Sequence, residues 1–469
     1  MIPPSSLYHY SHSHDASSFK SFWFFIPTTL ALLTSLFILF YVYYTSIIFT
    51  IHHQHHNLQH TLHFKSSSPT SHNNHSEFIK SHTFKLDGVG LQSQRGLSPQ
   101  PSSKESNPRG NALAYGSQKF EENNNVFHDE DIFLEDYKEM NKTFKIYVYP
   151  HKKDDPFANV LFPMKTEPSG NYASESYFKK ALMNSHFITK DPTEADLFFM
   201  PFSIASLRHD RRVGVGGIKD FIKDYVQNIN QNYPYWNRTG GADHFYVACH
   251  SVGRTAMDKA PEVKFNAIQV VCSSSYFLTG YITHKDACLP QIWPRNDNPS
   301  NLVSSHRKKL AFFAGAANSP LRRTVVERWK NDSEIFVHRG RLKTPYADEL
   351  LGSKFCLHVK GYEVNTARIG DSLYYGCVPV IVADYYDLPF VDVLNWKSFS
   401  VVVTTLDIPF LKKILKGIVS SGEYLRLHRN VLKVREHFQW HSPPLDFDVF
   451  YMVMYELWLR RSSIPILSI

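Results

Sequence analysis

The residue types best suited to chemistry gather in one short stretch of the C-terminal third of the chain. Lys360, Gly361, Glu363, Arg368 and Asp371 follow one another there. An arginine guanidinium can hold two phosphate oxygens at once, and a lysine adds positive charge beside it. A glycine lets the backbone approach a ligand closely, and carboxylates accept hydrogen bonds from hydroxyl groups. The pattern indicates a site for a diphosphate.

An ordinary structural role stays open for two of these residues. Asp371 follows Arg368 at a spacing that also suits an ion pair on the surface of one helix. Such a pair would only support the helix and would leave Arg368 unavailable to a phosphate.

The elements around this stretch are predicted to be a strand, a glycine loop, a helix and a second strand. Residues 355–359 and 377–382 are short β-prone runs, the second apolar and β-branched as in a buried parallel strand. Asn365 is expected to cap a helix that runs to about Tyr375, and Gly376 stands where a helix-ending glycine belongs. A loop that enters a helix N-terminus presents free N–H groups, which suit a diphosphate.

Short apolar runs alternate with helical stretches from about Lys142 onward. This alternation predicts two parallel sheets with helices on both faces, two Rossmann-like halves that meet near residues 290–304. Ligands of such sheets bind outside the carboxyl ends of the strands, so we expect the site in a cleft between the halves. The predicted strands are 145–149, 197–201, 245–249 and 267–272 in the first half, and 310–314, 335–337, 355–359, 377–382 and 399–403 in the second.

Several motifs in a fixed order resemble those of exostosin-like glycosyltransferases, glycosyltransferase family 47, particularly its plant members. They are Gly361-Tyr362-Glu363, Arg368, Asp371 and the run from Gly376 to Ile381, with similar pieces at 145–149, 172–175, 195–201, 241–245 and 312–315. The resemblance covers about residues 140 to 455. It implies an α/β fold of two Rossmann-like domains facing a cleft (GT-B type), with an acceptor-side domain at 141–300 and a nucleotide-sugar-binding domain with a closing helix at 301–469.

The same resemblance implies an inverting transfer of a hexosyl or pentosyl group from a UDP-sugar to a cell-wall polysaccharide or a protein glycan. A base must then remove the proton of the acceptor hydroxyl. Asp243 and His244, just before a predicted strand, and His250, just after it, are the candidates, although His244 is also suited to bonding the backbone at the start of the strand. The donor-binding residues implied are Gly315, Arg322, Lys360, Gly361, Glu363, Arg368 and Asp371.

Two departures from the family pattern support a second interpretation. Asp371 stands where the family usually has a glutamate, and Ser251 stands where it often has an acid. A catalytically silent binding or scaffold subunit, in complex with other glycosyltransferases, is therefore the alternative function. No acidic pair stands at a predicted site position, so we expect no metal and no cofactor, with positive side chains stabilising the leaving diphosphate.

The N-terminal part is predicted to hold the chain in a membrane. Residues 22–49 contain no charged side chain and, as a helix from Pro27, would span about 35 Å, enough for a bilayer core of about 30 Å. We expect a cytosolic tail at 1–21, an anchor at 22–50 and a mostly disordered stem at 51–140, a cleaved signal peptide being the alternative to the anchor. A Golgi type II orientation with a lumenal catalytic part rests on the resemblance and on glycosylation sequons at Asn74, Asn141, Asn237 and Asn331.

Charge and cysteine content exclude other classes of protein. The chain of 469 residues carries a formal charge of +8 without a dense basic tract, which argues against nucleic-acid binding and suits anionic substrates. The five cysteines form no CxxC pair, so a zinc site is not expected. Their odd number leaves at least one free thiol, unless that cysteine pairs with another chain. Cys356 and Cys377 lie in predicted core strands and are expected to be buried apolar residues rather than a disulfide.

Overall fold

The computed structural model describes residues 125–158, 168–277, 280–295, 299, 302 and 307–462, which belong to one compact unit of the chain. The predicted tail and anchor, most of the predicted stem and the sequon at Asn74 lie outside these residues. Within the described ranges, no helix combines the length and the apolar character that crossing a bilayer requires.

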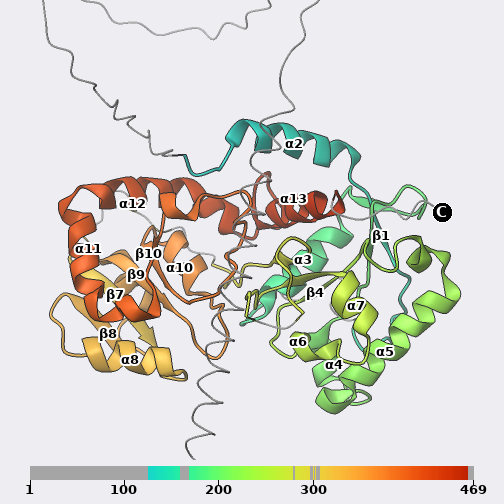
Figure 1. The fold of residues 1–469 in the computed structure, drawn as a ribbon, viewed down its shortest axis with the longest axis horizontal. Helices are drawn as coiled ribbons and strands as arrows, with labels where there is room; N and C mark the ends of the chain where they lie inside the picture. Colours follow the sequence, from blue (N-terminus) through green and yellow to red (C-terminus); the bar gives the residue numbers. More distant parts are fainter. Residues whose placement is uncertain are drawn as a thin grey trace, which may run out of the picture. The chain divides into compact units, whose positions relative to one another are not determined.

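Two parallel sheets form the framework, each the centre of one lobe (Figure 1). The first lobe has the strand order β2-β1-β3-β4-β5-β6, and the second has β11-β10-β9-β7-β8. The strands are β1 (Ile146–Val148), β2 (Ile188–Thr189), β3 (Leu197–Phe199), β4 (His244–Ala248), β5 (Ile268–Val271), β6 (Ala287–Cys288), β7 (Lys309–Gly315), β8 (Ile335–Arg339), β9 (Ser353–Val359), β10 (Val378–Val382) and β11 (Val401–Val402). The prediction of two parallel α/β halves is confirmed, and only the short edge strands β2 and β6 were missed.

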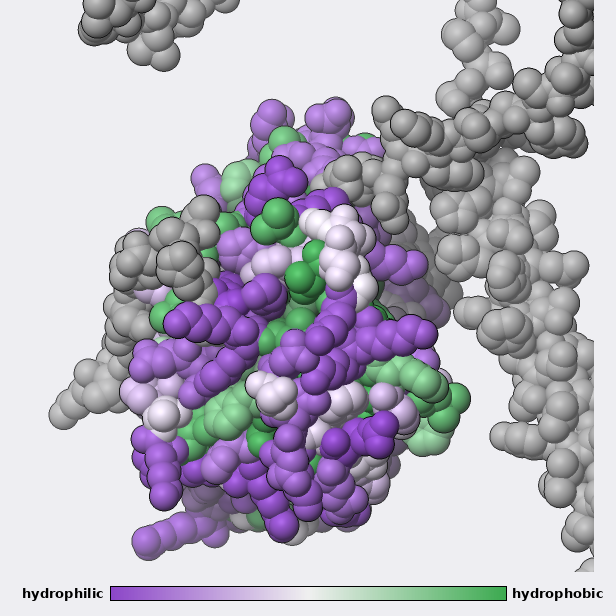
Figure 2. Space-filling view, turned by 90° about the vertical axis from the view of Figure 1, so that its left-hand side faces the viewer, coloured by the Kyte–Doolittle hydropathy of each residue, from purple (hydrophilic) through white to green (hydrophobic). Residues whose placement is uncertain are grey.

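Helices cover both sheets, with α4 to α7 on the first lobe and α8, α11 and α12 on the second (Figure 1). The end of the molecule that carries the second lobe is largely hydrophilic, with apolar side chains only in scattered patches (Figure 2). The α-helices are α2 (Glu130–Thr143), α3 (Ala173–Met183), α4 (Ile204–His209), α5 (Gly214–Asn232), α6 (Gly253–Ala256), α7 (Pro261–Asn266), α8 (Pro320–Trp329), α9 (Tyr346–Leu351), α10 (Arg368–Tyr374), α11 (Leu411–Ser420), α12 (Glu423–Val434) and α13 (Val449–Arg461). Short 3-10 helices are η2 (Pro234–Arg238), η3 (Trp396–Ser398), η4 (Thr405–Phe410) and η5 (Arg435–Phe438).

Helix α2 corrects the predicted end of the stem. It begins at Glu130, inside the stretch assigned to disorder, and Asp129 caps it by accepting a hydrogen bond from the Ile132 amide. Its apolar stripe, Phe133, Tyr137 and Met140, is buried in the main core. Sequence analysis missed this amphipathic helix because the residues before it are polar, although its apolar residues recur at helical spacing.

Helix α13 joins the two lobes at the C-terminal end of the fold. It packs against α2, α3 and β6 of the first lobe after the chain has completed the second lobe. The expected closing helix is therefore present, but it is not amphipathic, because neighbours bury it on most sides. Asp448 caps its N-terminus by accepting hydrogen bonds from the amides of Phe450 and Tyr451.

Two disulfides tie neighbouring parallel strands together. Cys249 is joined to Cys272 and Cys356 to Cys377, with Cα atoms 4.6 and 5.8 Å apart. The prediction that Cys356 and Cys377 are separate apolar residues is wrong, because β9 and β10 pair side by side and bring these positions within bridging distance. The predicted free thiol is Cys288, which is buried.

One buried carboxyl group makes the packing of α13 sensitive to pH. The side chain of Glu456 is buried, with the whole residue 2 % exposed, and its Oε2 has no hydrogen-bond partner in the part of the chain that the structure describes. Burial raises the pKa of Glu456 to about 8, an effect that the charge of Arg460 opposes. The folded chain therefore holds this proton more tightly than the unfolded chain does.

We expect the stabilisation from protonated Glu456 to be complete below pH 4.5 and to be lost as the pH rises to about 8. Substitution Glu456→Gln, a neutral side chain of the same shape, should flatten the fall of the melting temperature across this window. The measurement is thermal unfolding from pH 4.5 to 8, with the exposed Glu327→Gln as the control. An unchanged pH profile in Glu456→Gln would show that this carboxyl group is not the sensitive one.

Candidate functional site

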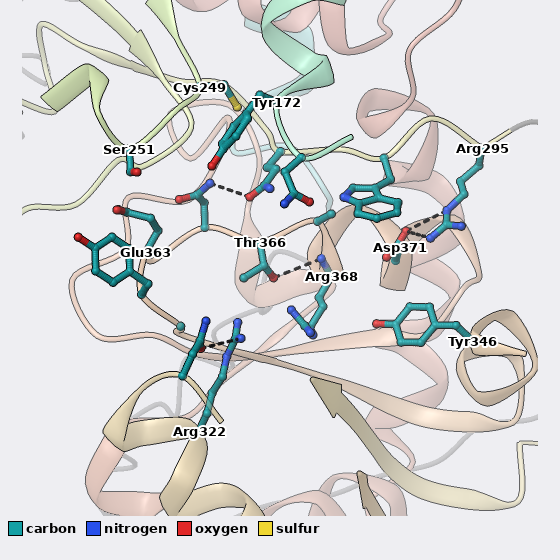
Figure 3. A pocket seen from close by; sticks show the side chains of 18 residues that line it. Tyr172, Cys249, Ser251, Arg295, Arg322, Tyr346, Glu363, Thr366, Arg368 and Asp371 are labelled. Carbon is teal, nitrogen blue, oxygen red and sulfur yellow. Dashed lines mark hydrogen bonds and ion pairs between the residues drawn. The ribbon is translucent and has the colours of Figure 1, made fainter. Parts of the chain in front are cut away.

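A cavity of about 590 Å³ lies between the lobes, at the carboxyl ends of the central strands (Figure 3). This is where open parallel sheets bind ligands. The first lobe contributes Asn171, Tyr172, Cys249 and Ser251; the connection between the sheets contributes Gln291, Trp293 and Arg295; and the second lobe contributes Asn318, Arg322, Tyr346, Gly361, Tyr362, Glu363, Asn365, Thr366, Ala367, Arg368 and Asp371.

Two arginines at this cavity share one aromatic ring. The guanidinium carbons of Arg322 and Arg368 lie 5.9 and 5.4 Å from the ring centre of Phe313 on β7. Neither arginine forms an ion pair with a carboxylate of the described residues; Arg322 donates to Val359 O, and Arg368 donates to Ala314 O. Burial and the charge of Arg368 lower the pKa of Arg322 to about 10. The pair is a site of concentrated positive charge that suits an anion with several oxygens.

Two glycines make room for these guanidinium groups. A Cβ atom on Gly361 would come within 2.7 Å of Arg322 Nη2, and one on Gly315 would overlap Arg368 Nη2. Close backbone approach was predicted for Gly361, although toward a ligand rather than toward Arg322. A larger residue at either position would force the neighbouring guanidinium group to shift from its present place.

Lys360 has a different place from the one predicted. It does not line the cavity; its backbone carbonyl accepts a hydrogen bond from Ser319, the residue that caps α8. Lys360 therefore helps to fix the start of the helix that carries Arg322. Its side chain is not among the residues that line the cavity, and phosphate binding by Lys360 stays a prediction.

A second cavity adjoins the first and shares Arg368 and Tyr346 with it. Its volume is about 580 Å³, and it is lined mainly by the loop from Gly340 to Pro345 and by Ala314 and Gly315. Arg368 thus stands where two spaces meet, a position suited to the middle of a long ligand.

The two acidic residues of the motif have separate partners. Glu363 accepts a hydrogen bond from Ser273 of the first lobe. Asp371 forms an ion pair with Arg295, whose Nη2 lies 2.7 Å from its Oδ1. Burial raises the pKa of Asp371, and the charge of Arg295 opposes this shift. The alternative pairing of Asp371 with Arg368 on one helix is therefore wrong, which leaves Arg368 available to an anion.

Asn365 is a lining residue whose role sequence reasoning misread. Helix α10 begins at Arg368 and has no side-chain cap, so the predicted cap is wrong. The Asn365 amide nitrogen donates instead to Gln291 Oε1 at 2.7 Å. Its Oδ1 has no hydrogen-bond partner among the described residues, although the residue is only 7 % exposed. A buried oxygen without a donor at the wall of a cavity suits a ligand hydroxyl group, a feature that no sequence spacing would reveal.

Asp243 and His244 do not belong to the cavity, which corrects their catalytic assignment. His244 is 0 % exposed, and its ring nitrogens bond to Asp243 Oδ1 and to the Tyr149 hydroxyl, both at 2.7 Å. It starts β4, at the sheet edge opposite to the one where the cavity lies. Arg238 and Thr239 complete the shell around Asp243. The pair is a buried structural network.

His250 lies beside the cavity without lining it. Its ring packs against Tyr172 with centroids 4.4 Å apart. The Val252 amide donates to Nδ1 at 3.1 Å, which places the proton of the neutral ring on Nε2. Burial lowers the pKa of His250, so the ring favours this neutral state. In this arrangement His250 positions Tyr172 and has no free basic nitrogen, so its assignment as the base is corrected.

The sequons in the described ranges differ in exposure. Asn237 and Asn331 are exposed, whereas Asn141 is half-buried in the last turn of α2. Glycosylation of these residues stays a prediction.

Comparison with known proteins agrees with this geometry. The family model of the exostosin GT47 domain matches residues 140–418. The chain belongs to this family. It is 39 % identical over 354 residues to a protein of Arabidopsis thaliana named a probable glycosyltransferase, with 73 % of this chain and 66 % of the relative covered.

Two further relatives from Arabidopsis thaliana have more specific names. One, named a probable beta-1,4-xylosyltransferase, is 28 % identical. The match covers 53 % of this chain and 65 % of the relative. Another, named a probable glucuronoxylan glucuronosyltransferase, is 26 % identical. That match covers 67 % of this chain and 73 % of the relative. The family and these relatives identify a glycosyltransferase of the plant GT47 type.

Substitution of Arg368 tests the anion site. Arg368→Ala should weaken UDP binding by about 1.5–3 kcal/mol, the range for hydrogen bonds to a charged group, which is roughly 10- to 100-fold. The UDP affinity of Arg368→Lys should lie between those of the unaltered chain and of Arg368→Ala, because lysine keeps the charge but not the paired N–H groups. The measurement is calorimetric titration with UDP. The control is Arg426→Ala, because Arg426 pairs with Glu423 on α12. Unchanged affinity in Arg368→Ala would rule out the phosphate contact.

Proposed function

We propose that this glycosyltransferase transfers a sugar, with inversion, from a UDP-sugar to a hydroxyl group of a cell-wall polysaccharide or a glycan. The observation that carries the proposal is the pair of arginines, Arg322 and Arg368, placed without a carboxylate partner from the described residues beside an interlobe cavity. A nucleoside diphosphate leaving group supplies the charge that this pair lacks.

The two adjoining cavities suit the two ends of such a donor. With the diphosphate at Arg322 and Arg368, the sugar occupies the larger cavity beside Asn365, and the nucleoside occupies the space along the loop from Gly340 to Pro345. The acceptor enters from the side of Tyr172 and Ser251. Its oxygen bonds to the anomeric carbon while the bond from that carbon to the diphosphate breaks.

Glu363 is the residue that we assign to the proton of the acceptor. It lines the cavity on the side of the second lobe and accepts a hydrogen bond from Ser273 of the first lobe. The proton passes from the acceptor hydroxyl to Glu363, and the two arginines balance the charge of the departing diphosphate. The proposed mechanism uses no divalent cation.

A Golgi location with a single N-terminal anchor is part of the proposal. Disulfides persist in oxidising compartments, and this chain has two of them in its core. The uncharged run at residues 22–49 and the sequons support a type II protein with a lumenal catalytic part. The names of the relatives make xylose and glucuronic acid the first donor sugars to try, with xylan as the first acceptor.

A silent binding subunit is the second candidate function. It is favoured by the positions of the histidines, since His244 is buried and the Nδ1 atom of His250 is engaged by the backbone. Such a subunit would bind UDP and partner another glycosyltransferase without turnover.

Release of UDP by the purified full-length chain tests the proposal. We expect turnover with one UDP-sugar of a panel of xylose, glucuronic acid, galactose and arabinose donors, in the presence of cell-wall oligosaccharides. EDTA should leave this rate largely intact, because guanidinium groups take the place of a cation. UDP binding without release for any donor would favour the silent subunit. Full loss of activity on chelation would contradict the metal-free mechanism.

A further inference from the structure

Three loops beside the cleft expose large aromatic rings. Tyr362 lies in the loop after β9, Tyr385 in the loop after β10 and Phe277 in the loop after β5. They are 75 %, 60 % and 75 % exposed. Because β9 and β10 are neighbouring parallel strands and all three loops follow carboxyl ends, the rings lie at the edges of the sheets where the cavity opens.

Contacts between the lobes hold these loops together. The Tyr276 amide donates to the Tyr385 carbonyl at 3.1 Å, and Ser275 forms an isolated antiparallel bridge with Tyr386. The rings of Phe277 and Tyr385 lie 5.6 Å apart. At the near end of the same segment, Ser273 donates to Glu363, which lines the cavity. The aromatic rings therefore continue the wall of the cavity outward along the seam.

The backbone of Tyr385 is held in an unfavourable conformation. Its φ is +63°, in the left-handed region that bulky side chains rarely adopt. Phe390 has a similar φ of +59°, but it is fully buried, so core packing compensates. Tyr385 has no such burial. Backbone strain that packing does not offset is typical of residues at ligand-binding sites.

We propose that Phe277 and Tyr385, with Tyr362 at the cavity rim, form a platform for the acceptor polysaccharide; this inference rests on the proposed function. The face of an aromatic ring is electron-rich and attracts the C–H face of a pyranose, while tyrosine hydroxyls bond to sugar hydroxyls. Sugar units next to the reacting end enter the cavity past Tyr362. Units farther along the chain stack on Phe277 and Tyr385.

This arrangement makes acceptor binding depend on chain length. A disaccharide fills the cavity without reaching the outer rings, whereas a hexasaccharide covers both. The double variant Phe277→Ala/Tyr385→Asn removes the rings, and asparagine tolerates the left-handed backbone at residue 385. The matched control is Leu425→Ala, an apolar side chain on α12 that is 63 % exposed.

Calorimetric titration of the full-length chain with xylohexaose, xylobiose and UDP tests the platform. The double variant should bind xylohexaose roughly tenfold more weakly, which is about 1.4 kcal/mol, because both stacking rings are lost. Its affinities for xylobiose and UDP should match those of the unaltered chain, as should all affinities of Leu425→Ala. The variant Phe277→Tyr/Tyr385→Phe, which keeps both rings, should restore xylohexaose binding.

Equal xylohexaose affinity in the double variant would overturn the platform, as would a failure of the unaltered chain to bind xylohexaose while it binds UDP. Failure of the unaltered chain to bind UDP would contradict the proposed function instead. Equal melting temperatures of the variants establish that lost binding is not lost folding.

Discussion

The site depends on two like charges held side by side against one ring. Arg322 and Arg368 both lie over Phe313, and the charge of Arg368 is among the causes that lower the pKa of Arg322. Such a pair costs free energy in a protein without an anion, because neither charge is neutralised by a carboxylate of the described residues. The surrounding fold must hold both side chains in place until a ligand supplies the opposite charge.

Several features of the second lobe serve this requirement. Backbone carbonyls at the ends of β7 and β9 accept the guanidinium N–H groups, and Gly315 and Gly361 leave them the space. Asp371, the nearest acid on α10, is occupied by Arg295 from the connection between the lobes. That pairing keeps a potential competitor away from Arg368. The lobe thus keeps the positive charge of the arginine pair, which we propose binds a diphosphate, apart from the carboxylate of Asp371.

The sequence predicted the framework well because strand patterns are local. Short apolar runs that alternate with helical stretches located both parallel sheets, and the spacing around Gly361 located Arg368 and Glu363 at the cleft. Pairings between distant segments could not be predicted in the same way. The bond from Asn365 to Gln291, the bridge between Cys356 and Cys377 and the ion pair of Asp371 with Arg295 all join residues far apart in sequence. The prediction for His244 was wrong because a histidine next to an aspartate in the sequence is compatible both with a buried network and with an active site.

A series of titrations with UDP, UMP and uridine tests the central claim most directly. If the two arginines bind the diphosphate, affinity should rise with each phosphate, by roughly tenfold or more per added group, and high salt should reduce the gain. Equal affinities for UDP and uridine would contradict the account, because the positive pair over Phe313 would then have no part in holding the donor.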